Sequence, residues 1–215
     1  YAFAGCVSIA NLNLASANVI GVGAFRLPEK SAKGYSSVTF PVAEEIGAEA
    51  FSGGKESGVV IPASLKKLGE GAFAYSDNLS GITVDEGNKD YFVYSNVLYR
   101  IISGNKDSGE YELCCYPSDY ISSVTDGAYT FQILEGTVAV QGGAFKGVKA
   151  NSLKRVVFPY SVKAIGSGAF YASGVTEYHF NCINAPTLYA DWFDNVMSAF
   201  NSLYYTNFVD EMLHH

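Results

Sequence analysis

Few residues in this sequence have the type and spacing that catalysis requires. There are three histidines, and two of them, His214 and His215, are the last two residues. The third, His179, lies between Tyr178 and Phe180, where we expect it to point out of a strand into solvent. An imidazole that acts as a general base needs a reacting group beside it, and no such pattern surrounds these histidines.

The acidic residues form no recognised site either. The segment 85–90, Asp-Glu-Gly-Asn-Lys-Asp, has the composition of a calcium loop but lacks the ligand order of an EF-hand, so a solvated turn is favoured. The sequence contains no G-x-S-x-G, H-E-x-x-H or phosphate-binding glycine loop. Two carboxylates that meet only in the fold, as in a glycosidase, stay open at this point. The sequence therefore predicts no enzyme, no cofactor and no metal site.

Composition narrows the class of protein. Of the 215 residues, 48% are hydrophobic and 16% are charged, which excludes an intrinsically disordered chain. The net charge of −7 argues against nucleic acid as a partner, because phosphates attract Lys and Arg. No run of 18 or more apolar residues predicts a transmembrane segment. The four cysteines, Cys6, Cys114, Cys115 and Cys182, include no C-x-x-C pair, and we expect buried free thiols.

A short phrase recurs along the chain: an aliphatic residue followed by Gly-x-x-Ala-Phe. Its copies lie at 20–25, 46–51, 68–73, 140–145 and 165–170, and the fourth has Gln141 in place of the first glycine. The phenylalanines of the third and fourth copies are 72 residues apart, close to three periods of 24. We therefore expect the array to continue through this gap with the phrase lost.

A second pattern alternates with the phrase. Apolar residues spaced three and then two apart, as in Tyr35, Val38 and Phe40, predict a short strand with one buried face. A proline such as Pro41 often follows and ends the strand. One such unit cannot bury its apolar side alone, so the units must stack into a continuous core with neighbouring strands in a parallel sheet.

These residues resemble the leucine-rich repeat of the BspA-like (Treponema-type) family of bacterial surface proteins. Segment 2–14 follows the consensus of that repeat, and segments 62–69 and 159–166 match its second half. The resemblance implies an α/β solenoid, a right-handed leucine-rich-repeat stack with one parallel sheet face. It also implies a secreted protein, extracellular or on the cell surface of a bacterium, with a role in adhesion.

The resemblance also divides the chain. It implies a solenoid over residues 1–182 with a β-hairpin insert at about 86–112, whose turn we place in the polar run 103–109. Residues 183–215 are interpreted as a C-terminal cap, containing a short helix from Asp191, or as the start of a further module.

The sequence leaves three functions open. The first is binding of a host or neighbouring-cell surface protein through outward strand positions. The second is a glycan-binding module, in which tyrosines of the insert contact the sugar. The third is a structural spacer without a ligand. The outward positions are Asn11, Asn13, Ser37, Thr39, Thr83, Thr130, Gln132, Arg155, Glu177 and His179, and the candidate tyrosines are Tyr91, Tyr94 and Tyr99.

Overall fold

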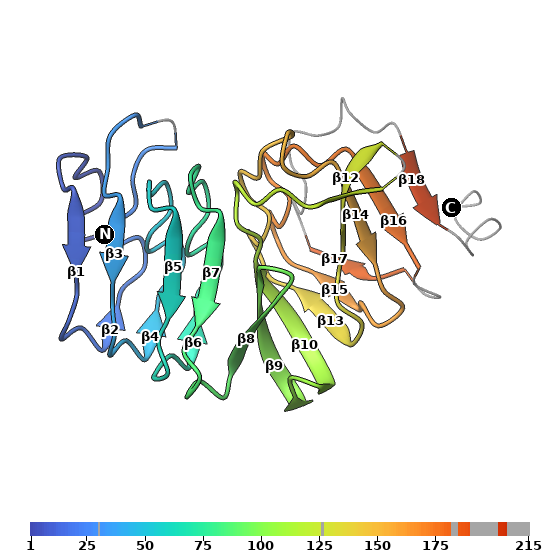
Figure 1. Ribbon diagram of the computed structural model, residues 1–215, viewed down its shortest axis with the longest axis horizontal. Coiled ribbons are helices and arrows are strands. Elements are labelled where there is room, and N and C mark those ends of the chain that lie inside the picture. Colours follow the sequence, from blue (N-terminus) through green and yellow to red (C-terminus); the bar gives the residue numbers. More distant parts are fainter. Residues whose placement is uncertain (30, 126, 182–184, 190–201, 206–215) are drawn as a thin grey trace.

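Figure 1 shows the computed structural model of the chain, which describes residues 1–29, 31–125, 127–181, 185–189 and 202–205. These residues form strands, turns and loops, and no helix occurs among them. The expected α/β class is therefore corrected to an all-β solenoid over this part of the chain. The return segments are short, glycine-containing turns, which give a helix no room to form. The helix expected from Asp191 lies outside the described residues.

Each coil consists of two short strands joined by a turn. In the second coil, β3 (Ser37–Thr39) buries Val38 and exposes the residues on either side, as the alternating pattern predicts. The chain then turns through Pro41 and enters β4 (Glu45–Ile46), where Ile46 is buried. The recurring phrase follows as a turn that leads into the next coil.

The strands stack in parallel on two faces, so the expectation of one sheet face is corrected. The physical reason is that the first residue of each phrase and the residue before it also pair with their counterparts in the next coil. The first face contains β1 (Asn11–Asn13), β3, β5 (Gly58–Ile61), β7 (Gly81–Val84), β12 (Ala128–Gln132), β14 (Arg155–Phe158), β16 (Glu177–Phe180) and β18 (Ser202–Tyr205). The second face contains β2 (Val19–Ile20), β4, β6 (Lys67–Leu68), β13 (Thr137–Val140), β15 (Ala164–Ile165) and β17 (Thr187–Leu188).

The packing of the phrase turns explains why small residues recur in the repeated phrase. The main-chain N–H of Phe51 donates to the carbonyl of Ala72 in the next coil at 2.8 Å, and the rings of Phe51 and Phe73 stack with centroids 5.6 Å apart. This contact leaves no space at the first glycine, since a Cβ on Gly69 would lie 2.2 Å from the main-chain nitrogen of Ala48. The glycine is therefore required by the close approach of two coils.

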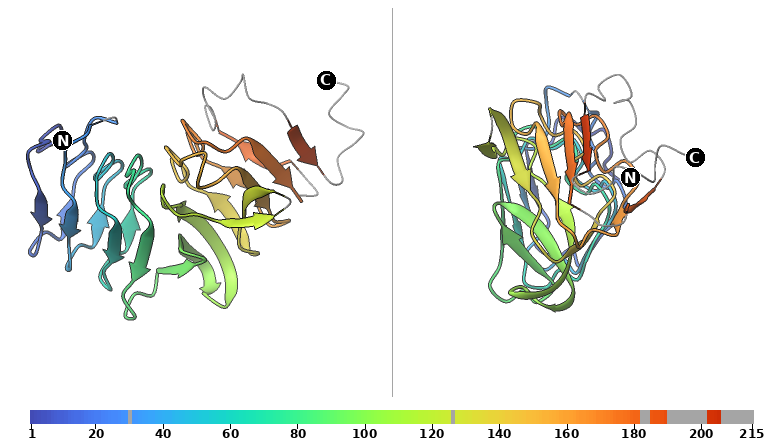
Figure 2. Two further views of the ribbon diagram at one scale, coloured as in Figure 1. Left: turned by 45° about the horizontal axis from the view of Figure 1, so that its top comes forward. Right: turned by 90° about the vertical axis from the view of Figure 1, so that its right-hand side faces the viewer.

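The insert is an antiparallel meander of three strands, whereas two were expected. It consists of β8 (Tyr91–Tyr94), β9 (Val97–Asn105) and β10 (Ser108–Cys115), and the turn between β9 and β10 falls in the polar run predicted for it. Strand β10 then pairs in parallel with β13, so the insert joins the second face. Figure 2 shows the insert between the N-terminal and C-terminal halves of the solenoid.

The interval of 72 residues is not filled by three ordinary coils, which corrects the expectation for the gap. The main-chain N–H of Gly71 donates to the carbonyl of Gly142 at 3.1 Å, and the main-chain N–H of Tyr75 donates to the carbonyl of Lys146 at 3.2 Å. The third and fourth phrase turns are therefore direct neighbours. On the first face, β7 pairs with β5, and β12 pairs with the antiparallel strand β11 (Ser123–Thr125) and with β14. The array is thus continuous at the phrase turns and interrupted on the first face.

Beyond residue 182, the described residues continue both faces. Strand β17 pairs in parallel with β15, and β18 pairs in parallel with β16.

Candidate functional site

A groove of about 640 Å³ lies on the first face in the C-terminal half. Its floor is formed by outward residues of β12, β14 and β16. One wall is the β8–β9 turn with Tyr94 and Ser95, and another is the segment from Tyr120 to Thr125 that leads into and forms β11. We call this hollow the sheet groove.

The strand register sets the floor in two rows. Thr130, Arg155 and Glu177 lie opposite one another across β12, β14 and β16 and form the first row, of which Thr130 and Arg155 line the groove. Gln132, Val157 and His179 form the second row, two residues further along the same strands. Because side chains alternate between the two sides of a strand, both rows point out of the core. The two rows contain five of the ten residues that the sequence predicts to point outward: Thr130, Gln132, Arg155, Glu177 and His179.

An ion pair fixes the first row. The Arg155 Nε donates to Glu177 Oε2 at 2.6 Å, and its Nη1 donates to the main-chain carbonyl of Thr125 at 3.4 Å. The Arg155 and Glu177 side chains retain only 16% and 18% of their exposure, so solvent screens this pair less than an ordinary surface pair. The contacts connect β16, β14 and β11, and therefore hold the groove wall to its floor.

The surroundings of His179 favour its neutral imidazole. Partial burial lowers the pKa of His179 below its ordinary value, and the positive charge of Arg155 lowers this pKa further, while Glu177 acts in the opposite direction. A neutral imidazole has one N–H donor and one acceptor nitrogen, so it can both donate and accept a hydrogen bond.

Two tyrosines stand at the groove walls. Tyr94, 47% exposed, precedes the tight β8–β9 turn, in which Ser95 and Asn96 adopt positive φ values of 46° and 63°. Tyr120 packs beside Tyr116, with ring centroids 5.6 Å apart. Tyr94 was among the predicted residues, whereas Tyr120 was not. The sequence places Tyr120 in the tyrosine-rich stretch in or near the insert, but nothing in that pattern distinguishes it from the other tyrosines there.

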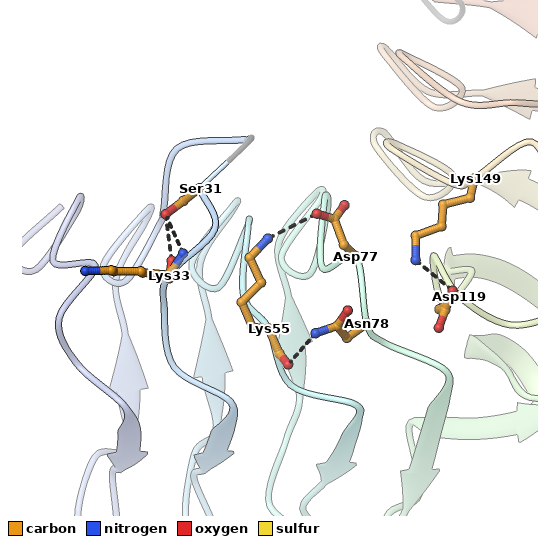
Figure 3. Close-up of polar contacts among 7 residues, drawn as sticks. All are labelled: Ser31, Lys33, Lys55, Asp77, Asn78, Asp119 and Lys149. Carbon is orange, nitrogen blue, oxygen red and sulfur yellow. Dashed lines mark hydrogen bonds and ion pairs between the residues drawn. The ribbon is translucent and has the colours of Figure 1, made fainter.

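The loop that carries Tyr120 is tied to its neighbours. Figure 3 shows the Lys149 Nζ paired with Asp119 Oδ1, 2.7 Å apart, and the main-chain N–H of Asp119 also donates to Leu79 at 2.8 Å. The same close-up shows Lys55 paired with Asp77. Their charged atoms lie 3.0 Å apart, and both residues line a separate hollow of about 710 Å³. The polar groups of that hollow connect consecutive coils, so we do not take it as the candidate site.

The other outward positions lie elsewhere on the first face. Asn11, Asn13, Ser37 and Thr39 are exposed on β1 and β3, where Thr39 Oγ1 donates to Asn13 Oδ1 at 3.3 Å. Thr83 is exposed on β7 and lines a different groove of about 490 Å³ on the other side of the insert. All five point outward as predicted, but none lines the sheet groove.

Two of the predicted glycan-stacking tyrosines are corrected to core residues. Tyr91 is 2% exposed and Tyr99 is 0% exposed. The Tyr91 hydroxyl accepts the main-chain N–H of Leu68 at 2.9 Å, and the Tyr99 hydroxyl accepts that of Leu134 at 3.3 Å. Their rings face the interior because inward positions of β8 and β9 must cover the core, so they cannot stack on a ligand.

The remaining reactive groups occupy structural positions. Cys114 and Cys115 are buried, and burial raises the pKa of Cys115 to about 12, which keeps that thiol protonated. Cys6 is exposed, which corrects the expectation of burial for that residue, and Cys182 lies outside the described residues. No group of three or more potential metal-binding side chains comes together within the described part of the chain. The same residues contain no helix long and apolar enough to span a membrane.

Three solved structures have a similar fold. The first is a leucine-rich cell surface protein from Faecalibacterium prausnitzii A2-165, with 24% identity and a TM-score of 0.68 over 87% of this chain and 52% of that one. The second is the pneumococcal vaccine antigen PcpA, with 25% identity and a TM-score of 0.60 over 80% of this chain and 39% of that one. A leucine-rich repeat protein from Eubacterium ventriosum ATCC 27560 has 21% identity and a TM-score of 0.56, over 84% of this chain and 56% of that one.

The chain thus spans about half the length of the first of these proteins. No curated protein matches it. The family described as "BspA type Leucine rich repeat region" matches residues 1–102 and 125–210, in six copies. These matches cover most of the chain, and the chain therefore belongs to the BspA-type leucine-rich repeat family.

Proposed function

We propose that this chain is an adhesion module of a bacterial surface protein, and that it binds a macromolecule of a host or neighbouring cell through the sheet groove. The family supports a role in surface interaction, and one protein of similar fold is described as a cell surface protein. Stacked repeats commonly bind through an extended sheet face. No catalytic step is part of this proposal.

One observation carries the proposal: the sheet groove combines residues from distant parts of the sequence. Its floor comes from three repeats, whereas Tyr94 comes from the insert that interrupts the array. The flat polar patch on β1 and β3 belongs to the same face without such a wall. A concave site with several converging polar groups is the preferred form of a binding site.

The test is binding of the purified chain to host cells and to a panel of immobilised extracellular-matrix proteins at physiological salt. Gln132→Lys places a long charged side chain in the groove, and we expect it to weaken binding at least tenfold. Thr39→Lys makes a comparable change at an outward strand position outside the groove and serves as the matched control. Thermal unfolding of both variants verifies that the fold is intact.

Two results would contradict this proposal. Equal binding by wild type and Gln132→Lys would remove the groove from the contact. Absence of saturable binding to every cell and protein in the panel would favour the structural spacer.

A further inference from the structure

We propose that the sheet groove binds a neutral oligosaccharide, so that the macromolecule is recognised through its uncharged sugar chain. This inference rests on the proposed function and names the ligand class of the same site. The argument uses the shape of the groove, the hydrogen-bonding groups on its floor, its charge balance and the tyrosines of its walls.

The shape of the groove favours a ligand that enters it. A volume of about 640 Å³ lies within the range of small-molecule sites, about 300–1,000 Å³. The centre of a protein–protein contact is, by contrast, depleted in charge and enriched in apolar residues. This groove combines the polar residues Thr130, Gln132, Arg155 and His179 with Val157 between them, and Phe131, Ile133 and Leu134 also line it.

The hydrogen-bonding groups of the floor match hydroxyl groups. A sugar hydroxyl both donates and accepts, and so do the Gln132 amide and a neutral imidazole such as that of His179. The Thr130 hydroxyl donates to the main-chain carbonyl of Ala128 at 3.1 Å and offers a ligand its acceptor lone pairs. Thr130 and Gln132 belong to β12 and His179 belongs to β16, and both strands pair with β14 in a fixed register, so the spacing of these groups is set before a ligand arrives. A ligand with many hydroxyl groups can therefore bind without reorganisation of the floor.

The charges of the groove favour a neutral ligand over an anionic one. The positive charge of Arg155 is compensated by Glu177 at 2.6 Å within the same row. Glu135 also lines the groove, and the whole chain carries a net charge of −7. Among the described residues that line the groove, a sialylated or sulfated chain would therefore meet no uncompensated cation, and the net negative charge of the protein would repel it.

The walls supply apolar surface for the faces of the sugar rings. Tyr94 and Tyr120 enter the groove from two different segments, the β8–β9 turn and the loop before β11. A tyrosine ring presents a large rigid face together with a hydroxyl, at low cost in conformational entropy. A pyranose ring has a C–H face and a rim of hydroxyl groups, so it can contact such a ring and the polar floor together.

The test is titration of the purified chain against neoglycoproteins that carry neutral oligosaccharides ending in mannose, galactose or N-acetylglucosamine. Sialylated and sulfated versions form the comparison set. We expect saturable binding to at least one neutral chain and at least tenfold weaker binding to its charged version. Tyr94→Ala should weaken binding at least tenfold, since it removes one wall, whereas Tyr160→Ala, at an exposed tyrosine outside the groove, should leave it unchanged.

The outcomes separate this inference from the proposed function. If the chain binds its target cells or proteins, binds no neutral oligosaccharide and keeps its binding after enzymatic removal of glycans from the target, the sugar inference is overturned and adhesion stands. Preference for sialylated or sulfated chains would also overturn it. If deglycosylation of the target abolishes binding and Gln132→Lys abolishes it too, both proposals are supported.

Discussion

The side-chain amide of Gln141 donates a hydrogen bond to the main-chain carbonyl of Leu68, 2.9 Å away and 73 residues earlier in the chain. In an ordinary coil, the first glycine of the next phrase provides this donor from its main chain, as Gly69 does for Ile46 at 2.7 Å. After β6, the insert separates the next coil from Leu68 along the chain. The side-chain amide of Gln141 supplies the donor that a main-chain glycine N–H supplies in an ordinary coil. The departure from the repeat consensus at position 141 therefore completes an interrupted sheet edge.

We predict that Gln141→Ala lowers the free energy of unfolding by about 1–2 kcal/mol, because the Leu68 carbonyl loses its donor in a partly buried position. Urea denaturation measures the change. Gln132→Ala is the matched control, since Gln132 is exposed in the sheet groove and should leave stability within about 0.5 kcal/mol. Equal stability of Gln141→Ala and wild type would contradict the capping role.

The second prediction concerns pH and Glu56, which is 0% exposed. Burial raises the pKa of Glu56 from 4.5 to about 7, and the nearby Ser76 hydroxyl and Lys55 charge offset only part of this effect. In the unfolded chain the carboxyl ionises near pH 4.5, whereas in the folded chain it keeps its proton until about pH 7. The unfolded state therefore binds fewer protons in this window, and stability falls as pH rises through it.

The total loss from this group is about 3 kcal/mol between pH 4.5 and 7. Glu56→Gln removes the ionisation, so we expect the variant to be as stable as wild type at pH 4 and more stable at pH 8. Guanidinium denaturation at several pH values measures both curves. If the unfolding free energy of the two proteins changed in parallel with pH, the pKa of Glu56 would be the same in the folded and unfolded chain, which would contradict this prediction.

The third prediction separates the tyrosines of the insert. Tyr91→Phe and Tyr99→Phe each leave a main-chain N–H without its acceptor, and each should cost about 1–3 kcal/mol of unfolding free energy. Tyr94→Phe should change stability little, because Tyr94 is 47% exposed. Differential scanning calorimetry of the three variants tests this order, and a stability loss for Tyr94→Phe as large as for the other two would contradict it.

The fourth prediction addresses the stacked phenylalanines of the phrase turns. Phe51 is 0% exposed, and its ring lies between those of Phe25 and Phe73, with centroids 5.8 and 5.6 Å away. Phe51→Ala should cost about 3–5 kcal/mol, since it leaves a large cavity between coils. Phe3 occupies the corresponding position at the N-terminal end and is 50% exposed, so Phe3→Ala should cost less than half as much. Similar losses for both variants would show that stacking across coils contributes little.

Local patterns predicted the repeating parts of the molecule well. The alternation around Val38 predicted a strand with one buried face, and the phrase ending in Phe51 predicted a close contact between coils. Both features depend on residues within one repeat, so a few neighbouring positions are enough to specify them. The second sheet face was missed because strands of two residues, such as β4, are too short to show a period of two.

The groove was only half predictable. The outward direction of Thr130, Gln132 and His179 followed from alternation, because the core occupies the other side of each strand. Their meeting with Tyr94 did not follow, since the path of an insert depends on contacts with distant segments. The same limitation explains Tyr91 and Tyr99, whose type suggested a binding surface while their neighbours in space made them core residues.

The sequence by itself determined the repeat family, the parallel stacking of short strands and the places of the phrase turns. It did so because one apolar pattern, copied many times, can bury its surface only against copies of itself. The tertiary structure alone decided how the array closes around its insert, which edge needs the Gln141 side chain, and where a concave site forms. These features depend on the relative position of segments some 70 residues apart, and no local pattern encodes that position.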